Sequence, residues 1–186
     1  MDAKIVDLSE ILIIGKESMD RVELKMAMLN DADCIGKIHS KAWKQSYENI
    51  FPREYLDHYS SQTRTQEFLE SIDDMNIEYY LGLVKGEPIG IIKIHIYDGN
   101  VEIESFYILG NYRGKSYGSQ MLEHLLGDRL EDKVYLWVLE ENLAARKFYE
   151  RNGFYNTGKT RVIYRGCEFT QCLYKNKKPW MKDNKY

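Results

Sequence analysis

The chain has 186 residues, 44% of them hydrophobic and 30% charged, which suits one folded domain and is too apolar for a disordered protein. Its formal net charge of −3 excludes the strongly basic surface that a nucleic-acid partner requires. The longest aliphatic run, Ile11 to Ile14, is far shorter than the ~20 apolar residues that cross a bilayer. No secretory signal pattern occurs at the N-terminus. We therefore expect a cytoplasmic protein with no membrane partner.

The cysteines and histidines give no metal or disulfide pattern. Three cysteines, Cys34, Cys167 and Cys172, are an odd and scattered set, which fits a reducing compartment. Cys167 and Cys172 lie five apart in an expected strand, where alternation places them on opposite faces. We predict no metal site and buried or half-buried thiols.

The N-terminal half begins with an extension, residues 1–20, to which we assign no function. Alternation from Arg21 to Met28 predicts a first strand, and Asn30 or Asp31 offers an N-cap for the helix that follows. Apolar residues at helical spacing mark that helix: Ile35, Ile38, Ala42 and Trp43. Two shorter helices are expected at 52–59 and 63–72, the first opening on Pro52.

Three β runs follow, at 78–84, 88–97 and 101–109. The first two are separated by Lys85-Gly86-Glu87 and the second pair by Asp98-Gly99, a strong hairpin signal. Short hairpin connections join antiparallel neighbours, so these three strands are expected to be antiparallel.

The pattern then changes to alternating helices and strands. A helix after the loop at 110–119 carries Met121, Leu122, Leu125 and Leu126, and an apolar strand follows at 133–139. A helix from Asn142 to Arg151, capped by Asn142, precedes two last strands at 154–164 and 167–174. We predict one α/β domain at 21–174 and a basic C-terminal tail at 175–186.

The loop between the third β run and the next helix is the most informative passage. Gly114 and Gly118 at a helix start leave backbone N–H groups directed at one spot, where the helix dipole adds positive charge. Such a site favours a phosphate, and Arg113 and Lys115 would add charge at its rim. A plain turn is the alternative reading of the glycines alone.

Two segments carry a resemblance to a known family. Arg113-Gly114-Lys115-Ser116-Tyr117-Gly118 resembles the acetyl-CoA-binding signature Q/R-x-x-G-x-G/A of the GCN5-related N-acetyltransferase (GNAT) superfamily. Residues 142–154, with an Asn, small residues, a Tyr and Gly-Phe, resemble its second element. The resemblance implies the GNAT fold over 21–174: a mixed, mostly antiparallel sheet of about seven strands flanked by helices. Ser116 replaces the signature's first glycine, which would cost about 1–2 kcal/mol if that residue needs a positive φ.

The resemblance also implies acetyl-CoA as cosubstrate and no metal. The backbone of Phe106 and Ile108 would bind the pantetheine arm, and Asn142 would reach it from the next helix. The pyrophosphate would lie on the N–H groups of the loop and helix start. The residues implied there are Arg113, Gly114, Ser116, Tyr117, Gly118 and Ser119.

Acetyl transfer to an amine needs a base for the ammonium and an acid for the leaving thiolate. By resemblance, Tyr149 matches the general acid and Glu102 aligns with the base of the histone acetyltransferase branch. Glu104 ranks second as base, and a water chain stays open. Alternation places both glutamates on the same side of their strand as Phe106 and Ile108.

The acceptor site is expected along the first two helices, because residues 43–56 resemble uncharacterised bacterial members of the superfamily. Between residues 48 and 78 there are eight acidic and two basic residues, an excess that would attract a cationic amine unless it is only a solvated face. Trp43 and Tyr47 would add cation–π contacts.

We therefore expect an acetyl-CoA-dependent N-acetyltransferase that acts by direct attack in a ternary complex, on a small cationic amine. The alternatives are a non-catalytic CoA-binding or sensor module, or a protein or peptide N-acetyltransferase. Formation of a homodimer is left open.

Overall fold

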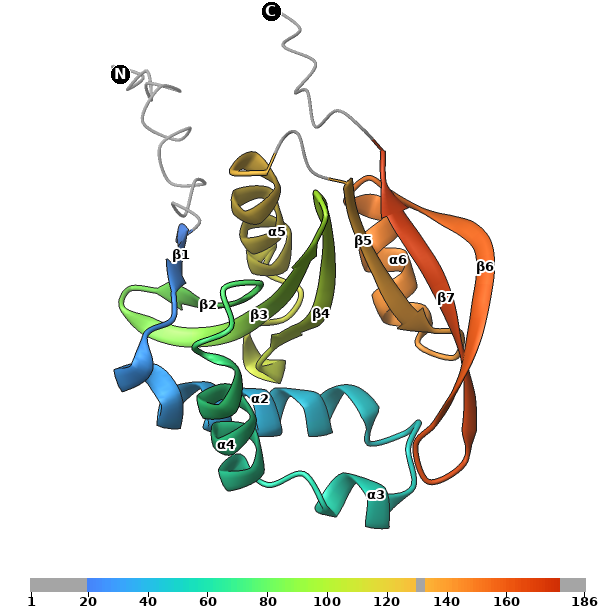
Figure 1. Cartoon of the computed structure of the whole chain (residues 1–186), viewed down its shortest axis with the longest axis horizontal. Helices are drawn as coiled ribbons and strands as arrows, with labels where there is room; N and C mark the ends of the chain where they lie inside the picture. The colour runs from blue at the N-terminus through green and yellow to red at the C-terminus, as the bar shows by residue number, and fades with distance from the viewer. Residues whose placement is uncertain (1–19, 130–132, 178–186) are drawn as a thin grey trace, which may run out of the picture.

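The computed structural model describes residues 20–129 and 133–177, which form one twisted sheet with helices on both faces (Figure 1). Within these residues the sheet is mixed and has seven strands, as predicted; their order is β1-β2-β3-β4-β5-β7-β6, and only the β4–β5 pair is parallel. The first half of the chain gives β1 (Val22–Met26), η1 (Leu29–Asp31), α2 (Ala32–Tyr47), α3 (Arg53–Asp57), α4 (Ser61–Ser71), β2 (Ile77–Val84), β3 (Glu87–Tyr97) and β4 (Asn100–Ile108). The second half gives η2 (Gly110–Tyr112), α5 (Tyr117–Gly127), β5 (Lys133–Leu139), α6 (Leu143–Arg151), β6 (Phe154–Tyr164) and β7 (Glu168–Asn176).

The structure bears on only one of the two predicted domain ends, the C-terminal one. Residues 1–19 of the expected N-terminal extension and 178–186 of the expected tail lie outside the described residues. The tail does not begin at Lys175, because β7 continues to Asn176 and Lys175 pairs with both Tyr135 and Tyr155. No helix in the described part of the chain is long and apolar enough to span a membrane. Of the thiols, Cys172 is buried and Cys34 partly buried, whereas Cys167 is exposed in the β6–β7 turn, contrary to expectation.

The two hairpins among β2, β3 and β4 form as predicted. Lys85-Gly86 and Asp98-Gly99 each join their strands with two residues, and all four have positive φ. Two left-handed residues give the turn the twist that matches a right-handed strand pair, which explains why each turn ends in glycine. The hairpins place β4 beside β3 along its whole length.

A parallel crossover through α5 connects β4 to β5. The two strands pair only from Asn100↔Lys133 to Glu102↔Tyr135. Beyond that point β4 stays with β3 and β5 stays with β7, so the ribbons of β4 and β5 diverge (Figure 1). Among residues 20–129 and 133–177, the divergence leaves one edge of β4 beyond Glu102 without a strand partner.

A bulge in β4 changes which residues share a face. Ile92 lies opposite Phe106 and Ile94 opposite Ile103, so Glu104 is an extra residue in β4. Ile92 and Ile94 both belong to the core under α5 and α6, which puts Phe106 on the same face as Ile103. The prediction that Glu102 and Glu104 share a side with Phe106 and Ile108 is therefore wrong, because strict alternation assumes an unbroken ladder.

The helices cover the sheet with two apolar cores and an aromatic layer. The core under α5 and α6 includes Met121, Leu122, Leu125 and Leu126, as the helical spacing predicted. The opposite core joins α2 and α4 through Ile35, Ile38 and Phe68. A third cluster around Trp43 and Phe51 ties the end of α2 to α3 and β7.

His39 is a buried histidine within α2, only 4% exposed and stacked on the Tyr107 ring with centroids 5.3 Å apart. Burial lowers the pKa of His39 well below its ordinary value of 6.5, and the charges of Arg64 and Lys93 lower it further. Below pH 6.5, His39 is therefore protonated in the unfolded chain while it stays neutral in the folded chain. Stability from the neutral ring is complete above that pH and is lost as the pH falls.

We expect His39→Phe, which keeps a ring on Tyr107, to flatten the loss of stability in acid. The difference in free energy of unfolding between wild type and variant should change by about 1.4 kcal/mol per pH unit below the ordinary histidine pKa. Urea unfolding from about pH 7.5 to about pH 5 measures it. His58→Gln, at an exposed histidine, is the control and should keep the wild-type slope. Parallel curves for His39→Phe and wild type would contradict the assignment.

Candidate functional site

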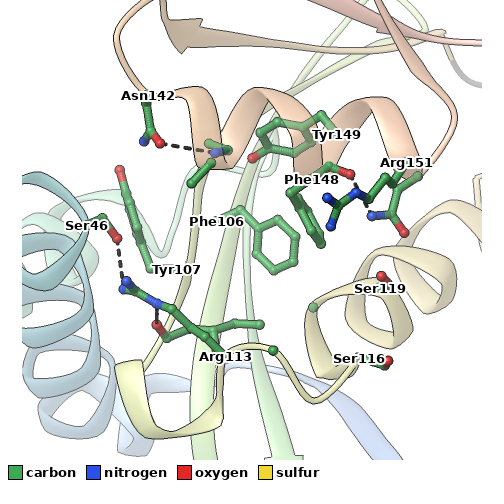
Figure 2. Close-up of a pocket in the computed structure, with 16 residues that line it drawn as sticks. Ser46, Phe106, Tyr107, Arg113, Ser116, Ser119, Asn142, Phe148, Tyr149 and Arg151 are labelled. Atoms are coloured by element: carbon green, nitrogen blue, oxygen red, sulfur yellow. Dashed lines mark hydrogen bonds between the residues drawn. The ribbon is translucent and has the colours of Figure 1, made fainter.

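A cavity of about 620 Å³ opens where β4 and α6 separate. Its walls come from the end of β4, the loop before α5, the first turn of α5 and one face of α6 (Figure 2). The residues predicted for cofactor binding that line it are Phe106, Ile108, Arg113, Gly114, Ser116, Gly118, Ser119 and Asn142. Tyr117 does not line it and packs instead against the core and the ring of Tyr112.

The loop before α5 uses left-handed backbone at two residues. Gly114 has φ 75° and Ser116 has φ 61°, so the serine does occupy a conformation that favours glycine. Ser116 is the residue that precedes α5, and its side chain makes no capping hydrogen bond. A Cβ on Gly118 would lie 3.1 Å from Ile108 and Phe148, so glycine there lets the helix approach the strand closely. The first turn of α5, whose N–H groups have no helical partners, contributes Gly118 and Ser119 to the cavity lining.

Arg113 does not extend its charge toward that helix end as expected. Its Nε donates to the carbonyl of Ile108 at 2.8 Å, and its Nη2 donates to the Ala42 carbonyl at 3.1 Å and the Ser46 hydroxyl at 3.0 Å. Figure 2 shows the guanidinium turned toward Ser46, away from Ser116. The carbonyls of α2 thus hold the arginine that the sequence assigned to the phosphate rim. Lys115 stays exposed, with its ammonium 5.7 Å from the Tyr112 ring centroid.

Asn142 begins α6 as predicted, because its Oδ1 accepts from the Ala145 N–H at 3.1 Å. The capping bond leaves the amide nitrogen as the group that can reach into the cavity. Asn142, Ala145 and Tyr149 share the face of α6 that lines the cavity, as their spacing indicated. The small Ala145 keeps that face open between the two polar residues.

A second cavity, of about 90 Å³, adjoins the first. Both are lined by Ser46, Phe106, Tyr107, Asn142, Ala145 and Tyr149. The smaller one adds Tyr47, Glu104 and Trp137. The shared residues make the two cavities neighbours across the gap between β4 and β5, with Tyr149 at their junction.

Tyr149 is 8% exposed and is the buried tyrosine of α6. Burial raises the pKa of Tyr149, and the nearby Tyr107 raises it further. Burial also raises the pKa of Tyr107 and of Tyr47. All three phenols therefore keep their protons at neutral pH and act as hydrogen-bond donors. In Figure 2 the Tyr149 hydroxyl is directed toward the side where Tyr107 lies.

The structure separates the two candidate glutamates. Glu104, at the bulge, lines the smaller cavity with Tyr149, forms an ion pair with Lys93 at 2.7 Å and lies 3.3 Å from His95 Nδ1. Glu102 lines neither cavity and accepts a hydrogen bond from Tyr135 at 3.1 Å. Of the two glutamates, Glu104 is therefore the one that lies at a cavity beside Tyr149.

Of the two predicted acceptor residues, only one lines a cavity. Tyr47 lines the smaller cavity, whereas Trp43 is 5% exposed and lies behind it within the aromatic cluster. The Arg64 guanidinium covers the rings of Trp43 and Tyr59, at 5.1 and 4.5 Å from their centroids. None of the eight acidic residues between 48 and 78 lines either cavity.

Sequence reasoning missed Ser46, Tyr107 and Trp137. Tyr107 follows Phe106, and alternation gave it to the other face of the strand; the open gap between β4 and β5 lets both neighbours reach a cavity. Trp137 lies in an apolar strand with no polar signal around it. The one signal for Ser46 is its place as a polar residue next to Tyr47 in the last turn of α2.

Comparison with known proteins agrees with this geometry. The model of the acetyltransferase (GNAT) family matches residues 40–154, a range that contains every residue lining the two cavities. A spermidine N(1)-acetyltransferase of Thermoplasma acidophilum is 23% identical over 141 residues, 72% of this chain and 88% of that protein.

Two solved structures share the fold. The PaiA N-acetyltransferase of Thermoplasma acidophilum in complex with coenzyme A has a TM-score of 0.63 at 22% identity, covering 83% of this chain and 98% of that one. A spermidine N-acetyltransferase of Vibrio cholerae in complex with CoA and spermine has a TM-score of 0.64 at 18% identity, covering 83% and 94%.

The strained Ser116 leads to a prediction about stability. We expect Ser116→Gly to raise the free energy of unfolding by up to about 1 kcal/mol, because glycine adopts a positive φ without strain and no capping bond is lost. Ser119→Gly, two residues into α5, is the matched control and should lower it by about 0.5–1 kcal/mol. Urea unfolding of both variants measures the difference. A neutral or destabilising Ser116→Gly would show that the left-handed serine carries no strain.

Proposed function

The chain belongs to the acetyltransferase (GNAT) family and is an N-acetyltransferase, and we propose that it transfers the acetyl group of acetyl-CoA to the primary amine of a small cationic acceptor. The transfer proceeds by direct attack in a ternary complex. The observation that carries the proposal is the meeting of a large and a small cavity at Tyr149, so that two substrates can reach one point.

The larger cavity suits acetyl-CoA in shape and chemistry. Phe106, Phe148 and Ala145 give it apolar surface for the pantetheine arm, while the first turn of α5 offers N–H groups and a helix dipole to the pyrophosphate. Beyond Glu102, the edge of β4 that is not paired with β5 adds backbone groups that a pantetheine amide can bind, apart from the Ile108 carbonyl, which accepts from Arg113. When bound, acetyl-CoA supplies the activated acyl group.

Tyr149 is the proposed proton donor to the leaving thiolate. It lines both cavities, and its raised pKa keeps the phenol protonated at neutral pH, as a donor must be. A buried phenol is also shielded from competing water.

Glu104 is the proposed base, acting directly or through a water. An alkyl ammonium must lose its proton before it can attack, and Glu104 is the carboxylate that lines the smaller cavity. Its ion pair with Lys93 fixes the side chain at the bulge. Glu102, which accepts a hydrogen bond from Tyr135 and lines neither cavity, is the weaker candidate.

A cationic acceptor is supported by the smaller cavity and by the relatives. Tyr47, Tyr107 and Trp137 present aromatic rings beside Glu104, a combination that suits an ammonium on an apolar chain. The relative from Thermoplasma acidophilum is a spermidine acetyltransferase, and we propose a linear polyamine of that kind as the acceptor. The acidic residues of α3 and α4 contribute at most a long-range attraction.

A release assay for free CoA thiol, run on a panel of amines, tests this function. We expect spermidine and similar linear amines to be acetylated faster than amino acids or a peptide amine. The left-handed Ser116 is the observation that favours a CoA-binding module without turnover; binding of acetyl-CoA by calorimetry without thiol release from any amine would establish that module. Absence of binding to either CoA species would overturn the proposal itself.

We expect Tyr149→Phe to lower kcat by about 10²-fold or more while acetyl-CoA binds as in wild type, because only the proton donor is removed. Steady-state rates and calorimetry separate the two effects. Tyr155→Phe, on exposed β6 and outside both cavities, is the matched control. An unchanged kcat in Tyr149→Phe would remove this residue from the role.

Glu104→Gln should lower kcat/KM and move the rising limb of the pH–rate profile to higher pH, because turnover then depends on the small fraction of amine that is already neutral. Glu102→Gln makes the same chemical change two residues away and should shift the limb less. The profiles of both variants with spermidine measure this. A larger shift in Glu102→Gln would restore the ranking expected from the sequence.

A further inference from the structure

Arg113 and Gln45 join the cofactor loop to α2. Arg113 makes four hydrogen bonds: to the carbonyls of Ile108, Ala42 and Gln45, the last at 3.5 Å, and to the Ser46 hydroxyl. From the other side, Gln45 Oε1 accepts the N–H of Gly110 at 2.8 Å. We call this set, Arg113 with Gln45, the loop–helix latch.

The latch holds the part of α2 that forms the wall of the smaller cavity. Ser46 lines both cavities and Tyr47 lines the smaller one. Ser46 also donates to the Ala42 carbonyl at 2.7 Å, so the hydroxyl bound by Arg113 is itself fixed to the helix. Carbonyl groups in the last turns of a helix attract cations, which explains why the guanidinium turns to α2.

The same contacts compete with a role as phosphate ligand. A guanidinium has five N–H donors, and four hydrogen bonds already hold Arg113 to α2 and β4. Partial burial lowers the pKa of Arg113 slightly against the attraction of Glu48, and the group stays charged. Releasing it toward a phosphate would leave the Ser46 wall without its support.

We propose that Arg113 is a positioning residue that couples the two substrate sites: the loop conformation that binds acetyl-CoA also fixes Ser46 and Tyr47 as the acceptor wall. Cofactor binding, by ordering the loop, therefore orders the end of α2. This inference rests on the proposed function, since it takes the loop as the acetyl-CoA site.

Amide hydrogen exchange on the full chain tests the coupling without requiring the acceptor to be known. In wild type, saturating acetyl-CoA should slow exchange of the α2 amides at residues 44–47 by about 10-fold or more. In Arg113→Ala the slowing should fall below about threefold even with acetyl-CoA saturating. Amides at residues 79–82, inside β2 and outside both cavities, are the internal reference for global stability.

Two further variants separate the latch from charge. Lys115→Ala removes the same charge from the same loop without touching α2, and should keep the slowing. Arg113→Lys keeps the charge but has no planar fork to bind the α2 carbonyls and the Ser46 hydroxyl together, and should behave as Arg113→Ala. With spermidine as acceptor, Arg113→Ala should raise KM for the amine at least tenfold and Lys115→Ala should not.

The outcomes are distinguishable from failure of the proposed function. If wild type binds acetyl-CoA but α2 exchange does not respond, or if Arg113→Ala keeps the response, the latch is wrong. The latch is also overturned if Arg113→Lys restores the slowing of α2 exchange and Arg113→Ala loses about tenfold or more in acetyl-CoA affinity. That pair of results would assign the Arg113 side chain to the phosphate. If wild type binds no CoA species, the proposed function fails.

Discussion

Parallel pairing between β4 and β5 stops after three residue pairs, and the site depends on that interruption. Each strand pairs over a longer stretch with its other neighbour: β4 is paired with β3 as far as Ile108, and β5 is paired with β7 as far as Leu139. Backbone groups along the open edge of β4 then need partners, and burying them unpaired would cost free energy. The larger cavity lies against this edge, so these backbone groups are open to solvent or to a ligand and are not buried unpaired.

The bulge at Glu104 determines which β4 side chains lie at the gap between β4 and β5. One extra residue in β4 lets Phe106 and Ile108 face the α5 and α6 side while a carboxylate is directed toward Lys93 and His95 on the other face. Tyr149, reaching in from α6, meets both cavities. In the proposed ternary complex, the two substrates would occupy these adjoining cavities and meet at Tyr149, where the strands separate.

Helix α2 connects the fold to the site. Its first half is a core helix, with Ile35 and Ile38 packed against the sheet, and its last turn carries Ser46 and Tyr47 at the cavities. The aromatic cluster centred on Trp43 packs behind that turn. Hydrogen bonds from Arg113 join its end to the loop before α5.

By itself, the sequence determined the elements whose signals are local: the two-residue turns at Lys85-Gly86 and Asp98-Gly99, the cap at Asn142, and the helical face that joins Asn142 to Tyr149. These depend on backbone preferences and on periodicity within one element, and two motif segments sufficed to indicate the family. The tertiary structure alone decided the face of each glutamate, the destination of Arg113 and the inclusion of Tyr107. A one-residue bulge reverses alternation beyond it, and a long arginine binds whichever carbonyls lie within reach; both depend on partners distant in the sequence.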